Sequence, residues 1–226
     1  RNETVILAEN HFVTGDRKGQ GTYPKEEQKE FIPEKHQFHQ KKLVECFKFK
    51  KPGYYKGICC RNDVGEDAFF WQKSLNGSDT DLTFANLLIN KNYRRFVDEL
   101  VPVLKEREVL YVVNESANLS DLPFKVKKAF RIGSNCMVDN YGTIEEVKAY
   151  IKENDIRDHV VLCSAASLSN FIIRDCYDDN PNNTFLDIGS CLNPYLSLDG
   201  WIHTRGYLTH YWLASGSPYG EQVDIW

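Results

Sequence analysis

The chain has 226 residues, a formal net charge of −4 and a hydrophobic fraction of 42%. This length and composition supply enough apolar material for one substantial core and exclude a wholly disordered chain. No apolar run approaches the 18 residues of a transmembrane helix, and residues 1–4 lack a signal-peptide pattern. The mild acidity argues against a nucleic-acid binder, because phosphate contacts need clustered Lys and Arg.

Residues 1–50 are expected to form an irregular, partly helical arm, because residues 15–42 are polar, charged and weakly periodic. A more regular pattern begins at Lys51, and residues 51–226 are expected to form one domain. There the pattern predicts a strand over residues 53–60 and a short helix over residues 68–73. A further helix is predicted to start at residues 78–81, with Asp or Ser as its N-cap. The next predicted helix, residues 93–106, is expected to be kinked or split by Pro102.

Two continuous apolar runs, residues 108–113 and 159–163, predict strands buried on both faces, as in a parallel sheet. Shorter strands are predicted over residues 129–132 and 184–188. A helix that opens with a capping box at residues 143–146, and another that ends near Tyr177, are predicted between these strands. This alternation predicts an α/β fold with a Rossmann-like, doubly wound, mostly parallel sheet.

The seven cysteines form no CxxC pair, so zinc-ribbon and thioredoxin-like sites lack their usual motif. Cys59 and Cys163 lie within apolar runs, where cysteine usually behaves as a small buried hydrophobe. We therefore expect reduced structural thiols and a cytoplasmic protein. Five Asn-x-Ser/Thr triplets, beginning at Asn2, Asn76, Asn114, Asn118 and Asn182, fit secretion instead, and such triplets also arise by chance in an Asn-rich chain.

Ligands of open parallel sheets bind at the carboxyl ends of the strands, so the residues that follow each apolar run are the first site candidates. The chain has neither GxGxxG nor GxxxxGK[ST], which removes the main support for a dinucleotide oxidoreductase or a P-loop enzyme. The candidates are polar, acidic and rich in hydroxyls, and they comprise Asn62, Asp63, Glu66, Asp67, Asn114, Glu115, Ser116, Ser164, Ser167, Asp187, Gly189 and Ser190.

Two of these segments suit phosphate binding. The helix entered through residues 164–170 offers amide groups to a phosphate, and it equally fits a serine-capped helix without a ligand. Gly189 and Ser190 allow the backbone to approach a ligand closely, or they simply end a strand. In the tail, Arg205 can bind a diphosphate through two hydrogen bonds, and it also fits a structural role.

Carboxylates supply the candidate catalytic groups. Asp79 and Asp81 are close enough to share a divalent cation or to provide a general base, and they also fit the start of a helix. Glu66 and Asp67 precede the aromatic residues 69–71, a combination that suits sugar binding and also a solvated turn above a core cluster. His36 and His39 have a metal-like spacing without a third ligand, which favours an exposed polar helix.

Several stretches in this order resemble a family of polysaccharide-building glycosyltransferase-like proteins, distantly related to the GT-D class of sugar-nucleotide transferases. The Lys-, Asn- and aromatic-rich composition is also similar to that of members from large DNA viruses, such as chlorovirus xylosyltransferases. The stretches are NDVGEDAFFW (residues 62–71), DTDLTFANLL (79–88), FVDELVPVL (96–104), VLYVVNES (109–116), SAASLSNFII (164–173), NPNNTFLDIGSCLNPYL (180–196) and TRGYL (204–208).

The resemblance covers residues 53–208. It implies a Rossmann-like domain that binds a UDP-sugar and transfers the sugar to a glycan hydroxyl, without nucleic acid as a partner. GT-D enzymes carry an Asp-Gly-Glu segment near the first strand, and Asp63, Glu66 and Asp67 stand at the comparable place within Asp-Val-Gly-Glu-Asp.

From the residues and the resemblance together, the expected catalytic residues are Asp79, Asp81, Glu66 and Asp67, the first two also as ligands of Mn²⁺ or Mg²⁺. The expected donor-binding residues are Asp63, Asn114, Glu115, Ser164, Ser167, Asp187, Gly189, Ser190 and Arg205. Two other classes stay open: a Mg²⁺-dependent nucleotide or phosphoester hydrolase, and a non-catalytic carbohydrate-binding module.

Overall fold

The computed structural model of the chain describes residues 32, 35–59, 61, 65–85, 87–89 and 92–198. Their contacts divide into two compact units, with the boundary between Leu87 and Leu88. Helices and parallel strands confirm the predicted α/β class and are consistent with a Rossmann-like fold. None of the described helices is long and apolar enough to cross a membrane.

The first unit contains α2 (Gln37–Lys48), α4 (Glu66–Asn76) and a two-stranded parallel sheet of β1 (Lys56–Ile58) and β2 (Leu82–Phe84). The helix predicted to start at residues 78–81 is wrong. Asp81 has a positive φ of 63°, which a right-handed helix does not accept, and its carbonyl accepts a hydrogen bond from the Lys56 amide. The residues that follow therefore pair with β1 as a strand.

Lys56 fastens the end of α2 to this small sheet. Its Nζ donates hydrogen bonds to the carbonyls of Phe47 and Phe49, each at 2.7 Å. Burial, and then the nearby charge of Lys50, lower the pKa of Lys56 to about 8. Lysine therefore acts here as a half-buried helix cap.

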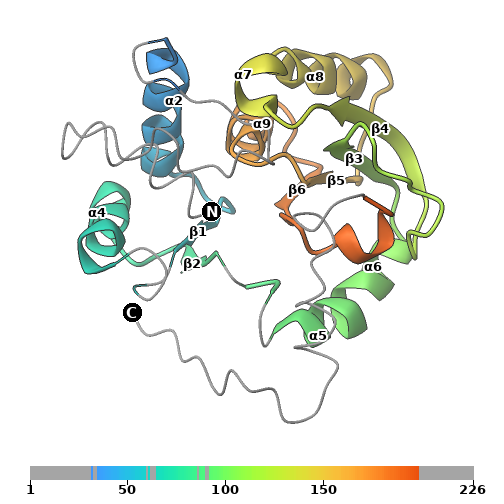
Figure 1. Cartoon of the computed structure of the whole chain (residues 1–226), viewed down its shortest axis with the longest axis horizontal. Helices are drawn as coiled ribbons and strands as arrows, with labels where there is room; N and C mark the ends of the chain where they lie inside the picture. Colours follow the sequence, from blue (N-terminus) through green and yellow to red (C-terminus); the bar gives the residue numbers. More distant parts are fainter. Residues whose placement is uncertain are drawn as a thin grey trace. The chain divides into compact units, whose positions relative to one another are not determined.

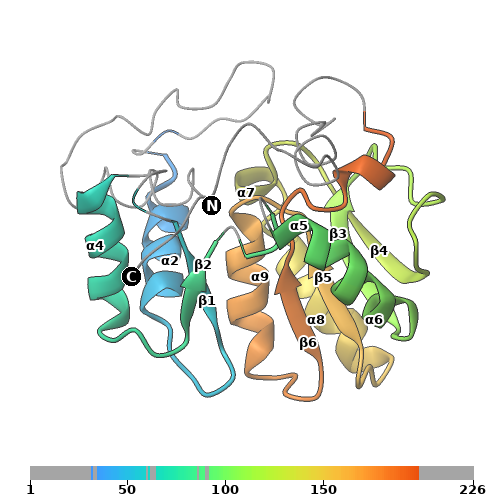
Figure 2. The same cartoon turned by 90° about the horizontal axis from the view of Figure 1, so that it is seen from below.

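The second unit is built on four parallel strands in the order β4-β3-β5-β6 (Figure 2). They are β3 (Val109–Asn114), β4 (Val126–Ile132), β5 (Val160–Cys163) and β6 (Thr184–Asp187). β3 and β5 occupy the middle of the sheet. The side chains of β5, and those of β3 up to Val113, are buried, which confirms the prediction from the two continuous apolar runs.

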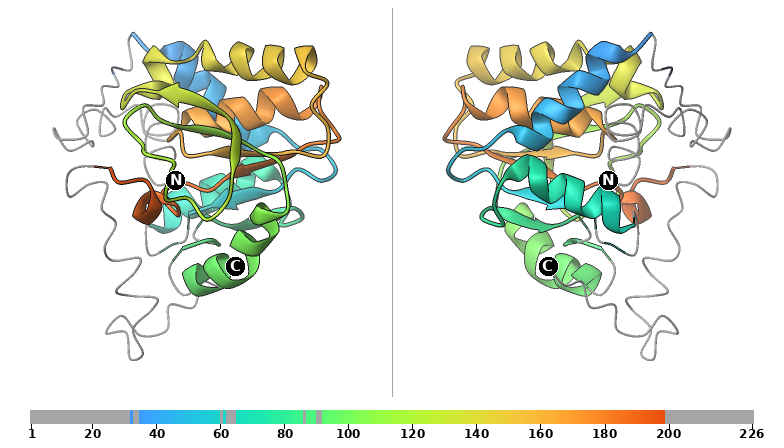
Figure 3. Two further views of the ribbon diagram at one scale, coloured as in Figure 1. Left: turned by 90° about the vertical axis from the view of Figure 1, so that its right-hand side faces the viewer. Right: turned by 90° about the vertical axis from the view of Figure 1, so that its left-hand side faces the viewer.

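Helices cover both faces of this sheet (Figures 1 and 3). On one face, α5 (Tyr93–Arg95), η3 (Phe96–Leu100) and α6 (Val101–Lys105) form one helical stretch that packs against alternate residues of β3. The η3 segment is a π-helical turn directly before Pro102. Proline lacks the amide hydrogen that would continue the helical ladder, so the predicted interruption is confirmed.

The opposite face carries α8 (Thr143–Glu153) and α9 (Leu168–Tyr177), with the short α7 (Cys136–Asp139) before them. Ile144, Val147 and Ile151, which recur at helical spacing, are the buried apolar side chains of α8. The predicted capping box is wrong, because α8 follows Gly142 and has no side-chain cap; Thr143 is already helical and buried. The sheet is doubly wound, as expected.

Candidate functional site

The chain leaves the two central strands of the four-stranded sheet in opposite directions. From β3 it runs to β4 on one side, and from β5 it runs through α9 to β6 on the other. Such a reversal opens a crevice at the carboxyl ends of the two strands, where ligands of open α/β sheets bind. Asn114 ends β3 and Ser164 follows β5, so two residues predicted from the sequence flank this point.

A pair of hydroxyl groups links these two strands. The Ser164 amide donates to the Val112 carbonyl at 2.9 Å, and the Ser164 Oγ lies 2.8 Å from the Tyr111 hydroxyl. Tyr111 is fully buried, whereas Ser164 is half-buried. A hydroxyl carries one donor and two acceptor positions, so Ser164 keeps the capacity to hydrogen-bond a ligand at the edge of the sheet.

The turn between β5 and α9 contains a strained residue. Ala166 has a positive φ of 44°, a conformation that costs a residue with a Cβ about 1–2 kcal/mol. The neighbouring Ala165 is held on both sides: its amide donates to Ser169 Oγ at 3.2 Å, and its carbonyl accepts from the Cys136 thiol at 3.3 Å. Backbone strain held in this way is typical of functional sites.

Ser167, predicted to contact a ligand, precedes α9 but does not cap the helix with its side chain. Only 1% of the residue is exposed, so its hydroxyl is not on the surface. What the turn offers to an anion is its backbone at the positive end of the helix dipole. The Ser169 and Asn170 amides already donate to the carbonyls of Ala166 and Ser167, at 3.1 and 3.2 Å.

The exit from β3 is a hydrogen-bonded polar turn. Asn114 Oδ1 accepts from the Ser116 amide at 2.8 Å. From β4, Arg131 Nη1 donates to the carbonyls of Asn114 at 3.1 Å and Ala117 at 2.7 Å. Glu115 lies within this fixed turn and is exposed, so its carboxylate is available to a ligand.

The exit from β6 forms a second fixed turn. Asp187, which pairs with Cys163 in the sheet, is exposed and accepts from the Gly189 amide at 3.0 Å. Gly189 has a φ of 53°, which glycine adopts without a steric penalty. Ser190 is half-buried, and its carbonyl accepts from the amide that opens the short helix η4 (Asn193–Tyr195).

The carboxyl ends of one sheet therefore gather most of the predicted donor-binding residues, and we call this region the carboxyl edge. Asp63 and Arg205 lie outside the described residues. The carboxyl edge comprises Asn114, Glu115, Ser164, Ser167, Asp187, Gly189 and Ser190.

The predicted catalytic residues belong to the first unit. Glu66 and Asp67 are exposed in the first turn of α4, where carboxylates complement the helix dipole. The Arg61 guanidinium lies 3.8 Å from the Glu66 carboxylate and 5.0 Å from the ring centres of both Phe69 and Phe70. The acidic turn and the aromatic run are thus joined through one arginine.

Asp79 and Asp81, the predicted metal ligands, do not form a metal site by themselves. The Asp79 carboxylate is exposed and lies 2.9 Å from the ammonium group of Lys73. Within the part of the chain that the structure describes, no three His, Cys, Asp or Glu side chains gather as metal ligands. A cation here would have to replace Lys73 and take its remaining ligands from substrate or water.

Three residues that support the carboxyl edge were not predicted from the sequence. Tyr111 stands within a run of aliphatic residues, which indicates burial but not the direction of its hydroxyl. Ser169 lies in a serine-rich stretch, and the sequence does not say which hydroxyl supports which amide. Arg131 follows an ordinary strand pattern. Tyr111 and Arg131 contribute through contacts with segments that only the fold brings near, and Ser169 contributes through a local contact with the Ala165 amide.

No family model, no curated protein and no solved structure matches this chain.

Proposed function

We propose that this chain is a glycosyltransferase that moves a sugar from a UDP-sugar to a hydroxyl of a glycan. The observation that carries the proposal is the switch point between β3 and β5, where a hydroxyl pair, an exposed carboxylate and the start of a ten-residue helix gather at one edge. The resemblance to GT-D transferases supplies the chemistry that such a nucleotide site would serve.

Each part of the carboxyl edge suits one part of a UDP-sugar. The amide groups at the start of α9 suit the diphosphate, because helix N-termini favour anions. The exposed carboxylate of Glu115 suits a ribose hydroxyl, as acidic residues near strand ends do in nucleotide-binding α/β folds. Ser164 can take part through the hydroxyl position that Tyr111 does not use.

In the proposed reaction the acceptor hydroxyl attacks the anomeric carbon, the bond from that carbon to the UDP oxygen breaks, and a carboxylate takes the hydroxyl proton. The sequence prediction gives the base role to Asp79 or Asp81 and the stabilisation of the positive charge on the sugar to Glu66 and Asp67. The support for these four roles is the sequence. No step is assigned to Mn²⁺ or Mg²⁺, because Asp79 and Asp81 do not form a metal site by themselves.

We also propose a cytoplasmic location. The six described cysteines are all buried, as expected of structural thiols in a reducing compartment.

The test is a panel of UDP-sugars incubated with the full chain, scored for nucleotide binding and for UDP release with and without glycan acceptors. We expect UDP to bind and UDP release to depend on an acceptor. Absence of nucleotide binding at millimolar concentration would overturn the proposal. Release without any acceptor, abolished by a chelator, would identify a metal-dependent hydrolase instead.

Variants separate binding from chemistry. Glu115→Gln should weaken UDP-sugar binding about tenfold through the loss of a charge-assisted hydrogen bond, whereas Glu153→Gln, an exposed change on α8, should not. Asp79→Asn or Asp81→Asn should remove turnover while UDP binding persists, and Glu45→Gln on α2 is the matched control. Glycan binding without turnover, unchanged by either aspartate variant, would indicate a carbohydrate-binding module.

A further inference from the structure

A groove lies at the opposite end of the four-stranded sheet, where β3 and β4 begin. Its volume of about 640 Å³ is within the range of small-molecule sites. We call it the amino-end groove. Four cationic side chains against two carboxylates give its lining a net charge of +2, in a chain whose net charge is −4. The charged lining residues are Lys105, Arg107, Lys125, Lys127, Glu106 and Glu108.

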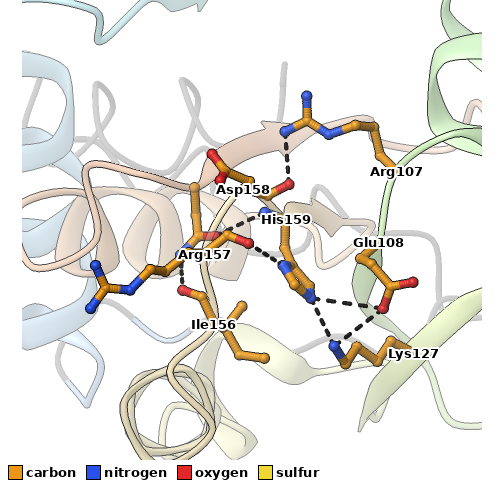
Figure 4. A network of polar contacts seen from close by, with 8 residues as sticks. Arg107, Glu108, Lys127, Ile156, Arg157, Asp158 and His159 are labelled. Atoms are coloured by element: carbon orange, nitrogen blue, oxygen red, sulfur yellow. Dashed lines mark hydrogen bonds and ion pairs between the residues drawn. The ribbon is translucent and has the colours of Figure 1, made fainter.

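Lys127 occupies a β-bulge in this groove. Val109 pairs with Val126 and Leu110 pairs with Lys128, so Lys127 is an extra residue in β4. Bulges redirect a side chain and are frequent beside functional sites. Here the lysine Nζ lies 3.2 Å from the Glu108 carboxylate, beside His159 (Figure 4).

His159 holds this lysine in position. Its side chain is only 11% exposed, and its Nδ1 donates to the Arg157 carbonyl at 2.5 Å. Nε2 lies 3.0 Å from the Lys127 ammonium, which carries donors and no acceptor, so Nε2 is the acceptor of this contact. The geometry therefore assigns the hydrogen of the neutral ring to Nδ1.

Arg107 is held by the same loop as Lys127. Its Nη2 donates to the Asp158 carbonyl at 2.8 Å, which leaves the remaining guanidinium donors available. Asp158 lies in a turn held by its own amide, which donates to the Asn182 carbonyl at 3.0 Å. In contrast, Lys105 and Lys125 have no ion pair or side-chain hydrogen bond with any other described residue.

We propose that the amino-end groove binds a small phosphate compound with two or three negative charges, a pyrophosphate or a phosphate monoester. The net positive charge of the lining attracts such an anion, and a guanidinium held in place can bind two phosphate oxygens at once. Lys105 and Lys125 would close on the anion without giving up an existing ion pair. This site is at the other end of the strands from the carboxyl edge, so it does not depend on the proposed transferase activity.

Inorganic pyrophosphate and phenyl phosphate, titrated separately into the full chain, test the site through amide chemical shifts, with sodium chloride at matched ionic strength to control for screening. We expect saturable shifts at residues 105–109 and 124–127. The probe that binds with the higher affinity shows whether the groove prefers an inorganic pyrophosphate or an organic phosphate monoester.

The double variant Lys105→Gln/Lys125→Gln should bind the anion at least about tenfold more weakly, because two charged contacts with the anion are lost. No contact within the protein is lost in this variant. Lys41→Gln/Lys152→Gln makes the same change in net charge at exposed positions outside the groove and should bind as the unmodified chain does.

Equal affinities of the two double variants would overturn the proposal. Shifts confined to residues 114–117 and 164–167 would also overturn it, because they would assign the anion to the carboxyl edge. Equal affinities of the two double variants would leave the UDP-sugar proposal untouched, because that proposal depends on the residues of the carboxyl edge.

Discussion

Asn183 joins the loop between α8 and β5 to the start of β6 by two buried hydrogen bonds. Its Oδ1 accepts from the His159 amide at 3.0 Å, and its Nδ2 donates to the Ile156 carbonyl at 2.8 Å. The loop needs this support because Asp155 and Asp158 both have positive φ, 45° and 57°. Through His159, the same loop also positions one wall of the amino-end groove.

Replacing Asn183 by leucine keeps a similar volume and removes both hydrogen bonds. The amide of His159 and the carbonyl of Ile156 then remain buried without this partner, at a cost of about 1–3 kcal/mol each. Added apolar burial offsets roughly 1 kcal/mol of that cost. We therefore expect the free energy of unfolding to fall by about 1–5 kcal/mol. Asn183→Asp should be no more stable than Asn183→Leu, because its carboxylate oxygen would face the Ile156 carbonyl.

The free energy of unfolding is measured by urea denaturation of the full chain. Amide hydrogen exchange of β5 then measures the opening free energy of the second unit directly. Asn182→Leu is the matched control: it is the adjacent residue and is exposed, so the change should stay within about 0.5 kcal/mol. If the two leucine variants are equally stable, the two hydrogen bonds do not stabilise the loop and the reasoning is refuted.

Three further predictions concern backbone strain, protonation and thiols. Ala166→Gly should raise the free energy of unfolding by up to about 1 kcal/mol in urea denaturation, because only glycine adopts positive φ freely. Ala166→Val should lower the free energy of unfolding. Equal effects of the two variants would show that the backbone at residue 166 is not strained. The pKa of Lys56, about 8, lies below the value near 10.4 of unfolded lysine, so between these values the unfolded chain binds more protons. The stability of the unmodified chain relative to Lys56→Met should therefore rise from pH 8 to pH 10 in unfolding curves, and a constant difference would exclude the shift. Burial raises the pKa of the Cys176 thiol to about 12, so a thiol reagent at pH 8 should not modify this residue in the folded chain. After unfolding without reductant, the same reagent should count seven free thiols, and a lower count would reveal a disulfide.

The central strands and the helices beside them follow from sequence periodicity. Every position of β5 and nearly every position of β3 is apolar because both faces of a central parallel strand are buried, and that requirement is visible in a single sequence. In α8, Ile144, Val147 and Ile151 recur at helical spacing for the same reason. Local capping patterns were less informative: both the helix start at residues 78–81 and the capping box at residues 143–146 were wrong.

The reason for these errors is that capping residues have alternative uses. Asp79 and Asp81 favour helix starts in isolation, but the left-handed backbone of Asp81 and its hydrogen bond with Lys56 direct the next residues into β2. Thr143 fits an N-cap, yet it is buried one residue inside α8. A pattern of four residues carries no information about a strand or core that places the same residues differently.

The sequence by itself determined the alternation of strands and helices and which polar residues follow each strand, because burial periodicity and chain order are local properties. Only the tertiary structure decided the strand order, the switch point between β3 and β5, and the division after Leu87. It alone brought Tyr111 to Ser164 and Lys127 to His159. These contacts join residues far apart in the chain, and hydrophobic periodicity within one segment carries no information about its partner.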